Sequence, residues 1–149
     1  MAYAESSDDK FFIPENLYLI GLMNTADRSL AMVDYALRRR FGFVDLLPGF
    51  HTDEFRSFLI EAGAKPSLVD RIVKRMAGLN KKIAEDTANL GPGFCVGHSF
   101  FCAVPDDTAP NDEWYERIIR TEIEPLLKEY WFDNPSQAES LVRDLLLID

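Results

Sequence analysis

The order of apolar and polar positions divides the chain into an N-terminal part with strand-length apolar runs and a C-terminal part with helical periodicity. Residues 17–23 read LYLIGLM, a continuous apolar run typical of a strand covered on both faces of a parallel sheet. The run alone is also compatible with a buried helix. The polar cluster NTAD at residues 24–27 follows directly, and such residues end a strand and cap a helix. We therefore expect a strand whose carboxyl end carries polar side chains, the edge where open α/β sheets hold ligands.

A basic amphipathic helix is expected to follow this strand. From about Asp27, apolar residues recur at three- and four-residue steps and form one seam of Leu30, Val33 and Leu37. Residues 41–46 then give a second apolar run, which ends at a Pro-Gly turn signal. Strand, helix and strand together predict a right-handed parallel crossover, which needs further strands to pair its sheet edges.

The remainder of the chain is expected to be helical, so the predicted fold is an α/β fragment in residues 1–47 followed by an all-α part in residues 48–149. Cap residues and apolar spacing predict four helices in the second part. They cover residues 52–62, 66–83, 111–130 and 134–146. Pro125 should kink the third helix. Residues 90–105 are rich in glycine and aromatic residues, and they predict a buried irregular connection or a small hairpin.

Three arginines end the basic helix, and they differ in the direction they point. At about 100° per residue, Arg40 lies near the edge of the apolar seam and Arg38 lies further round, beside Asp34. Arg39 points nearly opposite the seam and is the arginine most available to a group outside its own fold. The three charges would also complement the helix dipole, at about 0.3–1 kcal/mol each, so a purely structural role stays open.

The stretch PENLYLIGLMNTADRSLAMVDYALRRRFGF resembles the segment of McrB-type proteins that spans sensor 1 and the arginine finger. These proteins are the GTP-hydrolysing AAA+ motor subunits of modification-dependent restriction enzymes. The resemblance is dense over MNTADRS and DYALRRRF, and it continues more loosely through PGF, GHSFF and EIEPLLKEYWFD. It implies the C-terminal piece of an AAA+ core, with sensor 1 strand, arginine-finger helix and last strand, followed by the helical lid.

The resemblance also implies roles for residues at the end of the first strand. Asn24 would orient the attacking water or contact the γ-phosphate, a task that suits an amide because it both donates and accepts. Asp27 shares the signature through which the partner subunit McrC stimulates hydrolysis. Thr25 would lie beside the nucleotide, but Thr25 and Asp27 could instead simply cap the following helix, and for Thr25 the capping role is favoured.

By the same resemblance, Arg39 would be a finger that acts on the nucleotide of a neighbouring subunit, where it can raise the rate by about 10³ to 10⁵. Arg40 or Arg38 could take its place. Arg28 lies about three turns earlier on nearly the same helix face and would reach the same interface. A shared site of this kind implies a homo-oligomeric ring, a hexamer, in which a single subunit is inactive.

AAA+ motors also present a sensor 2 residue from the lid to the nucleotide phosphates. McrB-type sequences tend to carry an arginine in a GFRIGHSYF-like segment, and this chain has Cys95 in the place of the arginine. A neutral thiol cannot stabilise phosphate charge as a guanidinium does. His98 and Ser99 match the segment and are the remaining candidates for a nucleotide contact, while a structural role of His98 beside aromatic residues stays open.

Composition and charge limit the classes of protein to which this chain can belong. The 149 residues are 47% hydrophobic and 28% charged, as in soluble globular proteins, and no run approaches the roughly 18 apolar residues of a membrane span, so we expect a cytoplasmic protein. The net charge of −9 argues against nucleic-acid binding by the chain as a whole. Cys95 and Cys102 should be reduced, buried thiols, and with His51 and His98 they show no close zinc-type spacing, so no metal site is expected.

Two elements that nucleotide hydrolysis requires do not occur in this sequence. There is no GxxxxGK[ST] phosphate loop, the Walker A motif, and no apolar strand that ends in an acidic pair, the Walker B motif. We therefore expect this chain alone to bind no cofactor and to be inactive, as the C-terminal part of a larger motor that is either an expressed fragment or the product of a split gene. The complete motor would use GTP, or ATP, with Mg²⁺.

The resemblance implies a fragment of a GTPase motor that powers DNA translocation and cleavage by a methylation-dependent restriction endonuclease. The expected partners are further copies in the ring, a McrC-like endonuclease subunit, and DNA with modified cytosine bound through an absent N-terminal region. No membrane partner is expected. Two alternatives remain open: a stand-alone helical interaction module, and a part of a chaperone-type AAA+ ATPase.

Overall fold

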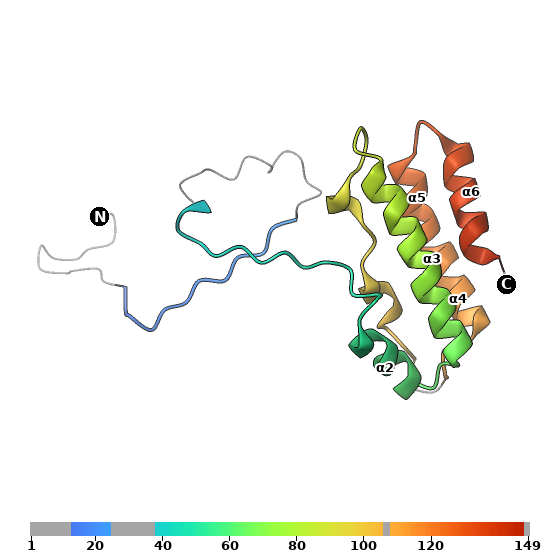
Figure 1. The fold of residues 1–149 in the computed structure, drawn as a ribbon, viewed down its shortest axis with the longest axis horizontal. Helices are drawn as coiled ribbons and strands as arrows, with labels where there is room; N and C mark the ends of the chain where they lie inside the picture. Colours follow the sequence, from blue (N-terminus) through green and yellow to red (C-terminus); the bar gives the residue numbers. More distant parts are fainter. Residues whose placement is uncertain (1–12, 25–37, 106–107, 148–149) are drawn as a thin grey trace, which may run out of the picture.

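The computed structural model describes residues 13–24, 38–105 and 108–147, and the regular structure within these ranges is helical (Figure 1). The α-helices are α2 (Asp53–Glu61), α3 (Pro66–Glu85), α4 (Asp112–Ile118), α5 (Glu124–Tyr130) and α6 (Pro135–Leu146). A π-helical turn, η4 (Ile119–Ile123), joins α4 to α5. Two 3-10 turns, η2 (Pro92–Phe94) and η3 (His98–Phe101), lie between α3 and α4. We call residues 48–147 the helical part, and all four helices expected for it are present.

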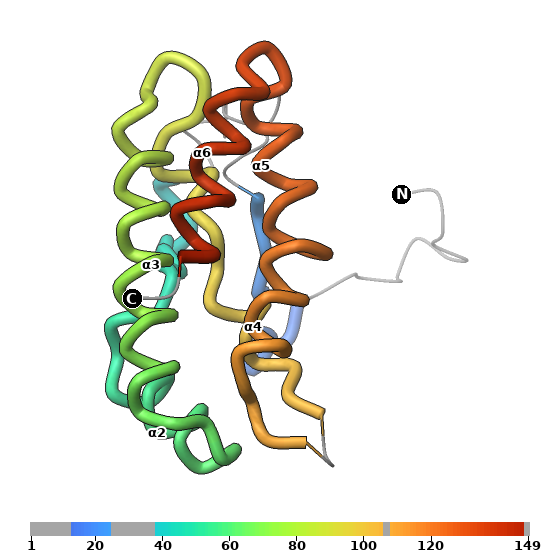
Figure 2. The backbone as a smooth tube through the Cα atoms, turned by 90° about the vertical axis from the view of Figure 1, so that its right-hand side faces the viewer, coloured from blue at the N-terminus to red at the C-terminus, as the bar shows by residue number. Residues whose placement is uncertain are grey.

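Three helical rods form the body of the helical part. The helix α3 and the continuous helix α4–η4–α5 run side by side, and α6 returns in the opposite direction and packs against both (Figures 1 and 2). The connection from α3 to α4 runs along the side opposite α6, and α2 lies at the end where α3 begins (Figure 1). This connection carries two of the candidate site residues.

A single apolar core fills the space between the rods. Its fully buried side chains include Ile72 and Met76 of α3, Ile119 and Ile123 of η4, and Leu127 of α5. Burial of an apolar side chain of this size stabilises the fold by about 1.5–3 kcal/mol relative to exposure. The buried residues of α3 are the apolar residues of its predicted face: Leu68, Val69, Ile72, Met76, Leu79 and Ile83.

Local capping explains why the helices begin where they do. Thr52 caps α2 because its hydroxyl accepts a hydrogen bond from the Phe55 amide at 3.3 Å. Asn111 caps α4 in the same way, with its Oδ1 accepting from the Trp114 amide at 2.8 Å. After α2, Gly63 takes a φ of 92°, a left-handed conformation that a glycine adopts without steric cost.

The kink expected at Pro125 takes the form of a π-helical turn. Proline lacks a backbone N–H and its ring clashes with the carbonyl four residues earlier, so a regular α-helix cannot pass through it. The turn η4 ends at Ile123, and Pro125 occupies the first turn of α5, where no N–H is needed. The chain therefore continues in the same general direction while the register of its side chains changes.

The predicted α/β fragment is not reproduced by the described residues. Residues 17–23 and 41–46 are extended but form no strand, and their large side chains face solvent: Ile20 is 91% exposed and Leu22 is 93% exposed. A strand requires backbone partners on its edges, and two short segments do not supply a stable sheet. The predicted helix between them falls mainly on residues 25–37, which lie outside the described residues.

Candidate functional site

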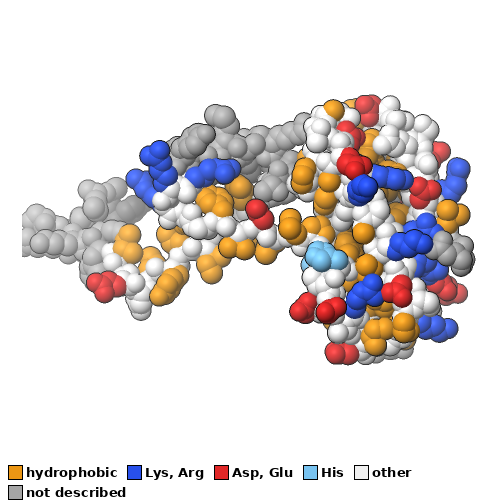
Figure 3. Space-filling model, in the orientation of Figure 1, with side chains coloured by type: hydrophobic (Ala, Val, Ile, Leu, Met, Phe, Trp, Pro, Cys, Tyr) orange, Lys and Arg blue, Asp and Glu red, His pale blue; other side chains and the backbone are white. Residues whose placement is uncertain are grey.

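The residues proposed around sensor 1 are only partly described. Asn24 is exposed at the end of the extended segment 13–24. Thr25, Asp27 and Arg28 lie outside the described residues, so their predicted roles stay predictions. The apolar side chains that precede Asn24 form much of the surface of this segment, which extends away from the helical part (Figure 3).

The three arginines are described, and all of them are exposed. The guanidinium of Arg38 lies over the Phe43 ring, with Cζ 5.6 Å from the ring centroid, a cation–π contact. Arg39 and Arg40 lie on the surface of the same segment, which leads towards the helical part. Their predicted positions relative to the apolar seam involve residues 27–37, which lie outside the described residues.

A polar side chain that the sequence reasoning missed holds the lid loop, residues 86–105, on α3. The Asn80 Oδ1 accepts a hydrogen bond from the Val96 amide at 2.7 Å, and the Asn80 Nδ2 donates to the Val96 carbonyl at 2.9 Å. One amide therefore pairs both backbone groups of a residue that is itself buried. The only sequence signal was an asparagine at the edge of the apolar face of α3, a position that a surface residue would also occupy.

His98 links the lid loop to the start of the helical part. Its Nδ1 accepts a hydrogen bond from the Gly49 amide at 2.9 Å, across 49 positions of sequence. The imidazole packs edge-on against Phe50 and Phe55, with ring centroids 6.3 and 5.8 Å apart. His98 is half-buried, and it connects two segments that carry predicted site residues.

Cys95 is uncharged in this environment. Its Sγ lies 3.6 Å from the Asn80 carbonyl oxygen, to which it donates, and burial raises the pKa of the thiol. Burial also raises the pKa of the Cys102 thiol, which donates to the His98 carbonyl at 3.5 Å. Both cysteines are free thiols, but the expected burial is wrong, because Cys95 is half-buried and Cys102 is exposed.

Ser99 is exposed and lines a shallow groove of about 460 Å³ between η3 and the helix α4–η4. Its lining includes two aromatic residues, Phe100 and Trp114, and two charged residues, Arg117 and Glu122. Ser99 and His98 are neighbours on η3, yet only Ser99 contributes to the groove.

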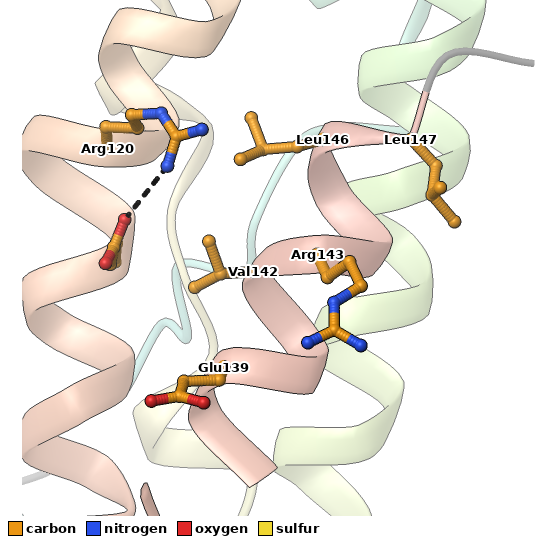
Figure 4. A pocket seen from close by; sticks show the side chains of 7 residues that line it. Arg120, Glu139, Val142, Arg143, Leu146 and Leu147 are labelled. Carbon is orange, nitrogen blue, oxygen red and sulfur yellow. Dashed lines mark ion pairs between the residues drawn. The ribbon is translucent and has the colours of Figure 1, made fainter. Parts of the chain in front are cut away.

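A second groove, of about 410 Å³, lies between α6 and the helix η4–α5 (Figure 4). It is lined by three apolar residues, Val142, Leu146 and Leu147, and by four charged residues, Arg120, Glu124, Glu139 and Arg143. Arg120 pairs with Glu124 at 3.7 Å, the ion pair drawn as a dashed line. None of the predicted site residues lines this groove.

In the part of the chain that the structure describes, a metal site would need a cluster of ligating side chains, and a helical membrane span would need a long apolar helix. No three histidine, cysteine or carboxylate side chains within residues 13–24, 38–105 and 108–147 come close enough to hold a metal ion. No helix within the same ranges is long and apolar enough to cross a membrane.

The geometry defines a helical domain that an extended, arginine-bearing segment enters through a glycine–histidine contact. Residues 71–139 match the family described as the alpha-helical lid domain of McrB. The chain thus carries the lid domain of the McrB family. It is 49% identical over 147 residues to the EcoKMcrB subunit of a type IV methyl-directed restriction enzyme from Escherichia coli K12. That similarity covers 98% of this chain and 32% of the relative's length.

Proposed function

We propose that this chain supplies the sensor 1, arginine-finger and lid portion of a McrB-like AAA+ GTPase. The motor would work in the cytoplasm with a McrC-like endonuclease subunit and would drive methylation-dependent restriction of DNA. The observation that carries the proposal is the 49% identity to a methyl-directed restriction subunit over 98% of the chain, a span that includes both arginine-bearing and lid segments. Activity would require a phosphate loop and an acidic metal-binding strand, which these 149 residues do not contain.

In the proposed motor, the described residues act at two positions. Asn24, at the exposed end of an apolar segment, would face the γ-phosphate of GTP and position the attacking water, with Mg²⁺ supplied with the nucleotide. Arg39 would reach the nucleotide of the adjacent subunit in a ring and stabilise transition-state charge. The exposure of Arg39 and Arg40 supports this role, because a finger must be free to enter another subunit.

The lid has a positional role in this proposal. The neutral thiol of Cys95 offers no cation to the phosphates, so the lid would act by closing over the nucleotide, with Ser99 at its exposed surface. Asp27, Thr25 and Arg28 keep the proposed roles of McrC-linked signature, nucleotide contact and interface residue.

The test uses the full-length protein that contains this chain. Arg39→Ala should lower GTP turnover by about 10³- to 10⁵-fold and leave binding of a non-hydrolysable GTP analogue nearly unchanged. Arg56→Ala is the matched control, because Arg56 is a lid arginine that pairs with Asp70 at 2.6 Å, and it should retain turnover. Arg38→Ala and Arg40→Ala identify the finger if Arg39 is not the residue.

A mixing experiment separates action within a subunit from action between subunits. Arg39→Ala subunits have intact phosphate loops, and subunits with a disabled phosphate loop have intact arginines. If the finger acts across the interface, a mixture of two inactive variants should recover part of the turnover. Loss of GTP binding by Arg39→Ala, with turnover per bound nucleotide unchanged, would contradict the finger role. If the full-length protein neither binds nor hydrolyses GTP or ATP, the helical interaction module is favoured. A preference for ATP would favour a chaperone-type motor.

A further inference from the structure

The arginine-bearing segment enters the helical part at Gly49, and aromatic side chains cluster around the backbone at this point. We call this the junction cluster, and it consists of Phe50, Phe55, His98 and Phe101. The ring of Phe50 lies at the centre, 5.4 Å from Phe55 and 5.9 Å from Phe101, both edge-on. Three segments of the chain meet here: the end of the extended segment, α2 and the lid loop.

The peptide groups of Gly49 are hydrogen-bonded on both sides. Its amide donates to His98 Nδ1 at 2.9 Å, and its carbonyl accepts from the Thr52 amide at 3.1 Å and from the Thr52 hydroxyl at 3.0 Å. Thr52 is in turn the cap of α2. The direction of the chain at Gly49 is thereby tied both to the lid loop and to the first helix of the lid.

A side chain at Gly49 would crowd the same contact. A Cβ at this position would lie 3.2 Å from His98 Cε1 and 3.3 Å from His98 Nδ1. The imidazole therefore lies directly against the glycine backbone, and a Cβ at this position would require the ring to shift by a few tenths of an ångström. Since Nδ1 accepts a hydrogen bond, the neutral imidazole carries its proton on Nε2.

We propose that His98 is a positioning residue that sets the direction in which the arginine-bearing segment, residues 38–47, enters the lid. It acts through Nδ1 and the Gly49 amide rather than by contact with the nucleotide. This inference rests on the proposed function, because the residue matters to turnover only if the lid and the arginines belong to one motor. Closure of the lid would then move the arginines as well, because the hydrogen bonds at Gly49 fix the direction of the segment relative to the lid.

The two nitrogens of the imidazole can be tested separately with two amide variants. In His98→Asn the Oδ1 takes roughly the place of Nδ1 and can still accept from Gly49. In His98→Gln the amide reaches the place of Nε2, and the acceptor for Gly49 is lost. His51→Gln is the control, because His51 is an exposed histidine two residues after Gly49 and has no part in the cluster.

The first readout is independent of catalysis. In the 149-residue chain, hydrogen exchange of the Gly49 amide should be slow in the wild type, in His51→Gln and in His98→Asn. It should be about tenfold or more faster in His98→Gln. A Gly49 amide that exchanges freely in the wild type would overturn the proposal, whatever the full-length protein does.

The second readout is the turnover of the full-length protein. His98→Asn should keep turnover within about twofold, and His98→Gln should lose about tenfold with little change in nucleotide affinity. Gly49→Ala should reproduce the loss with His98 intact. The reverse order, with His98→Gln active and His98→Asn weak in nucleotide binding, would mean a contact through Nε2 with the phosphates and would overturn the proposal. If the wild type hydrolyses no nucleotide, the proposed function fails, and the amide exchange still decides whether the junction contact exists.

Discussion

Apolar residues are frequent both in the two extended segments, residues 13–24 and 38–47, and in the helical part, but they are exposed in the former and mostly buried in the latter. Ile20 in the first extended segment is 91% exposed, whereas Ile72 in α3 is fully buried. The difference does not lie in the local hydrophobic pattern. It lies in where the backbone hydrogen bonds are made.

A helix pairs its own N–H and C=O groups within a few residues, so an apolar stripe is enough to fold it against a neighbour. A strand leaves both edges unpaired until other strands join it. The helical part supplies its own partners and closes a core around Ile72 and Leu127. The extended segments do not, and we expect their apolar faces to be covered by further strands of an AAA+ core.

The largest effect should come from the same substitution made in each region. Ile72→Ala should lower the free energy of unfolding by about 2–5 kcal/mol, because it leaves a cavity in a packed core. Ile20→Ala should change it by about 0.5 kcal/mol or less. Urea denaturation followed by tryptophan fluorescence measures both, since Trp114 and Trp131 are buried in the helical part.

Equal destabilisation by the two variants would break the comparison, because it would place the extended segment inside a packed core in solution. A full-length protein offers the complementary measurement. There, Ile20→Ala should become as costly as Ile72→Ala if other strands cover residue 20.

An intermediate effect should come from Asn80, which replaces a strand partner for the lid loop. Asn80→Ala leaves the buried N–H and C=O of Val96 without their partners at 2.7 and 2.9 Å, at about 1–3 kcal/mol for each buried group left unsatisfied. We expect a loss of about 2–3 kcal/mol and faster exchange of the Val96 amide. Lys81→Ala, on the exposed face of the same helix, is the control and should cost less than about 0.5 kcal/mol. Unchanged protection of Val96 would show that the loop holds its position without α3.

The smallest effect concerns Tyr115, whose hydroxyl donates to the Leu145 carbonyl at 2.9 Å and ties α4 to α6. Tyr115→Phe should cost about 1 kcal/mol at neutral pH. Burial raises the pKa of Tyr115 to about 12, and the guanidinium groups of Arg71 and Arg75 partly oppose this rise. The folded state therefore favours the neutral phenol, so its contribution is complete below pH 10 and is lost as the pH rises towards 12.

The pH dependence separates Tyr115 from the other groups that titrate in alkali. The difference in unfolding free energy between wild type and Tyr115→Phe should shrink or change sign between pH 10 and 12, at about 1.4 kcal/mol for each unit of pKa shift at most. A difference that stays constant over this range would mean that Tyr115 ionises as easily in the folded chain as in the unfolded one.

The sequence predicted the helical part well because its signals are local. Thr52 and Asn111 start helices where cap residues are expected, and Pro125 falls at a break in regular helix. The lid loop is the irregular connection that its glycines and aromatic residues indicated. The strands predicted for residues 17–23 and 41–46 are not formed in the described residues, because strand formation depends on partners distant in sequence.

The candidate site was predicted less completely, for a related reason. Motif resemblance singled out His98, but only the fold reveals that its Nδ1 accepts from Gly49, a residue 49 positions away. Asn80 carried no motif at all, because a single amide that pairs both groups of one buried residue leaves no periodic trace in the sequence. Arg39 and Asn24 are exposed, and their roles at the nucleotide stay predictions.

The π-helical turn η4 has a consequence for how the length of this helix can change. Four residues of a regular α-helix advance about 40° beyond a full turn, so side chains spaced by four drift around the rod. A wider turn absorbs one additional residue, and Ile119, Ile123 and Leu127 all stay fully buried at spacings of four. The side chains of α4 and α5 thus follow two different helical registers, which meet at η4. An insertion or deletion within η4 would rotate α5 against α4 by about 100° per residue. A change in chain length at η4 would therefore take Leu127 out of the core that it shares with Ile119 and Ile123.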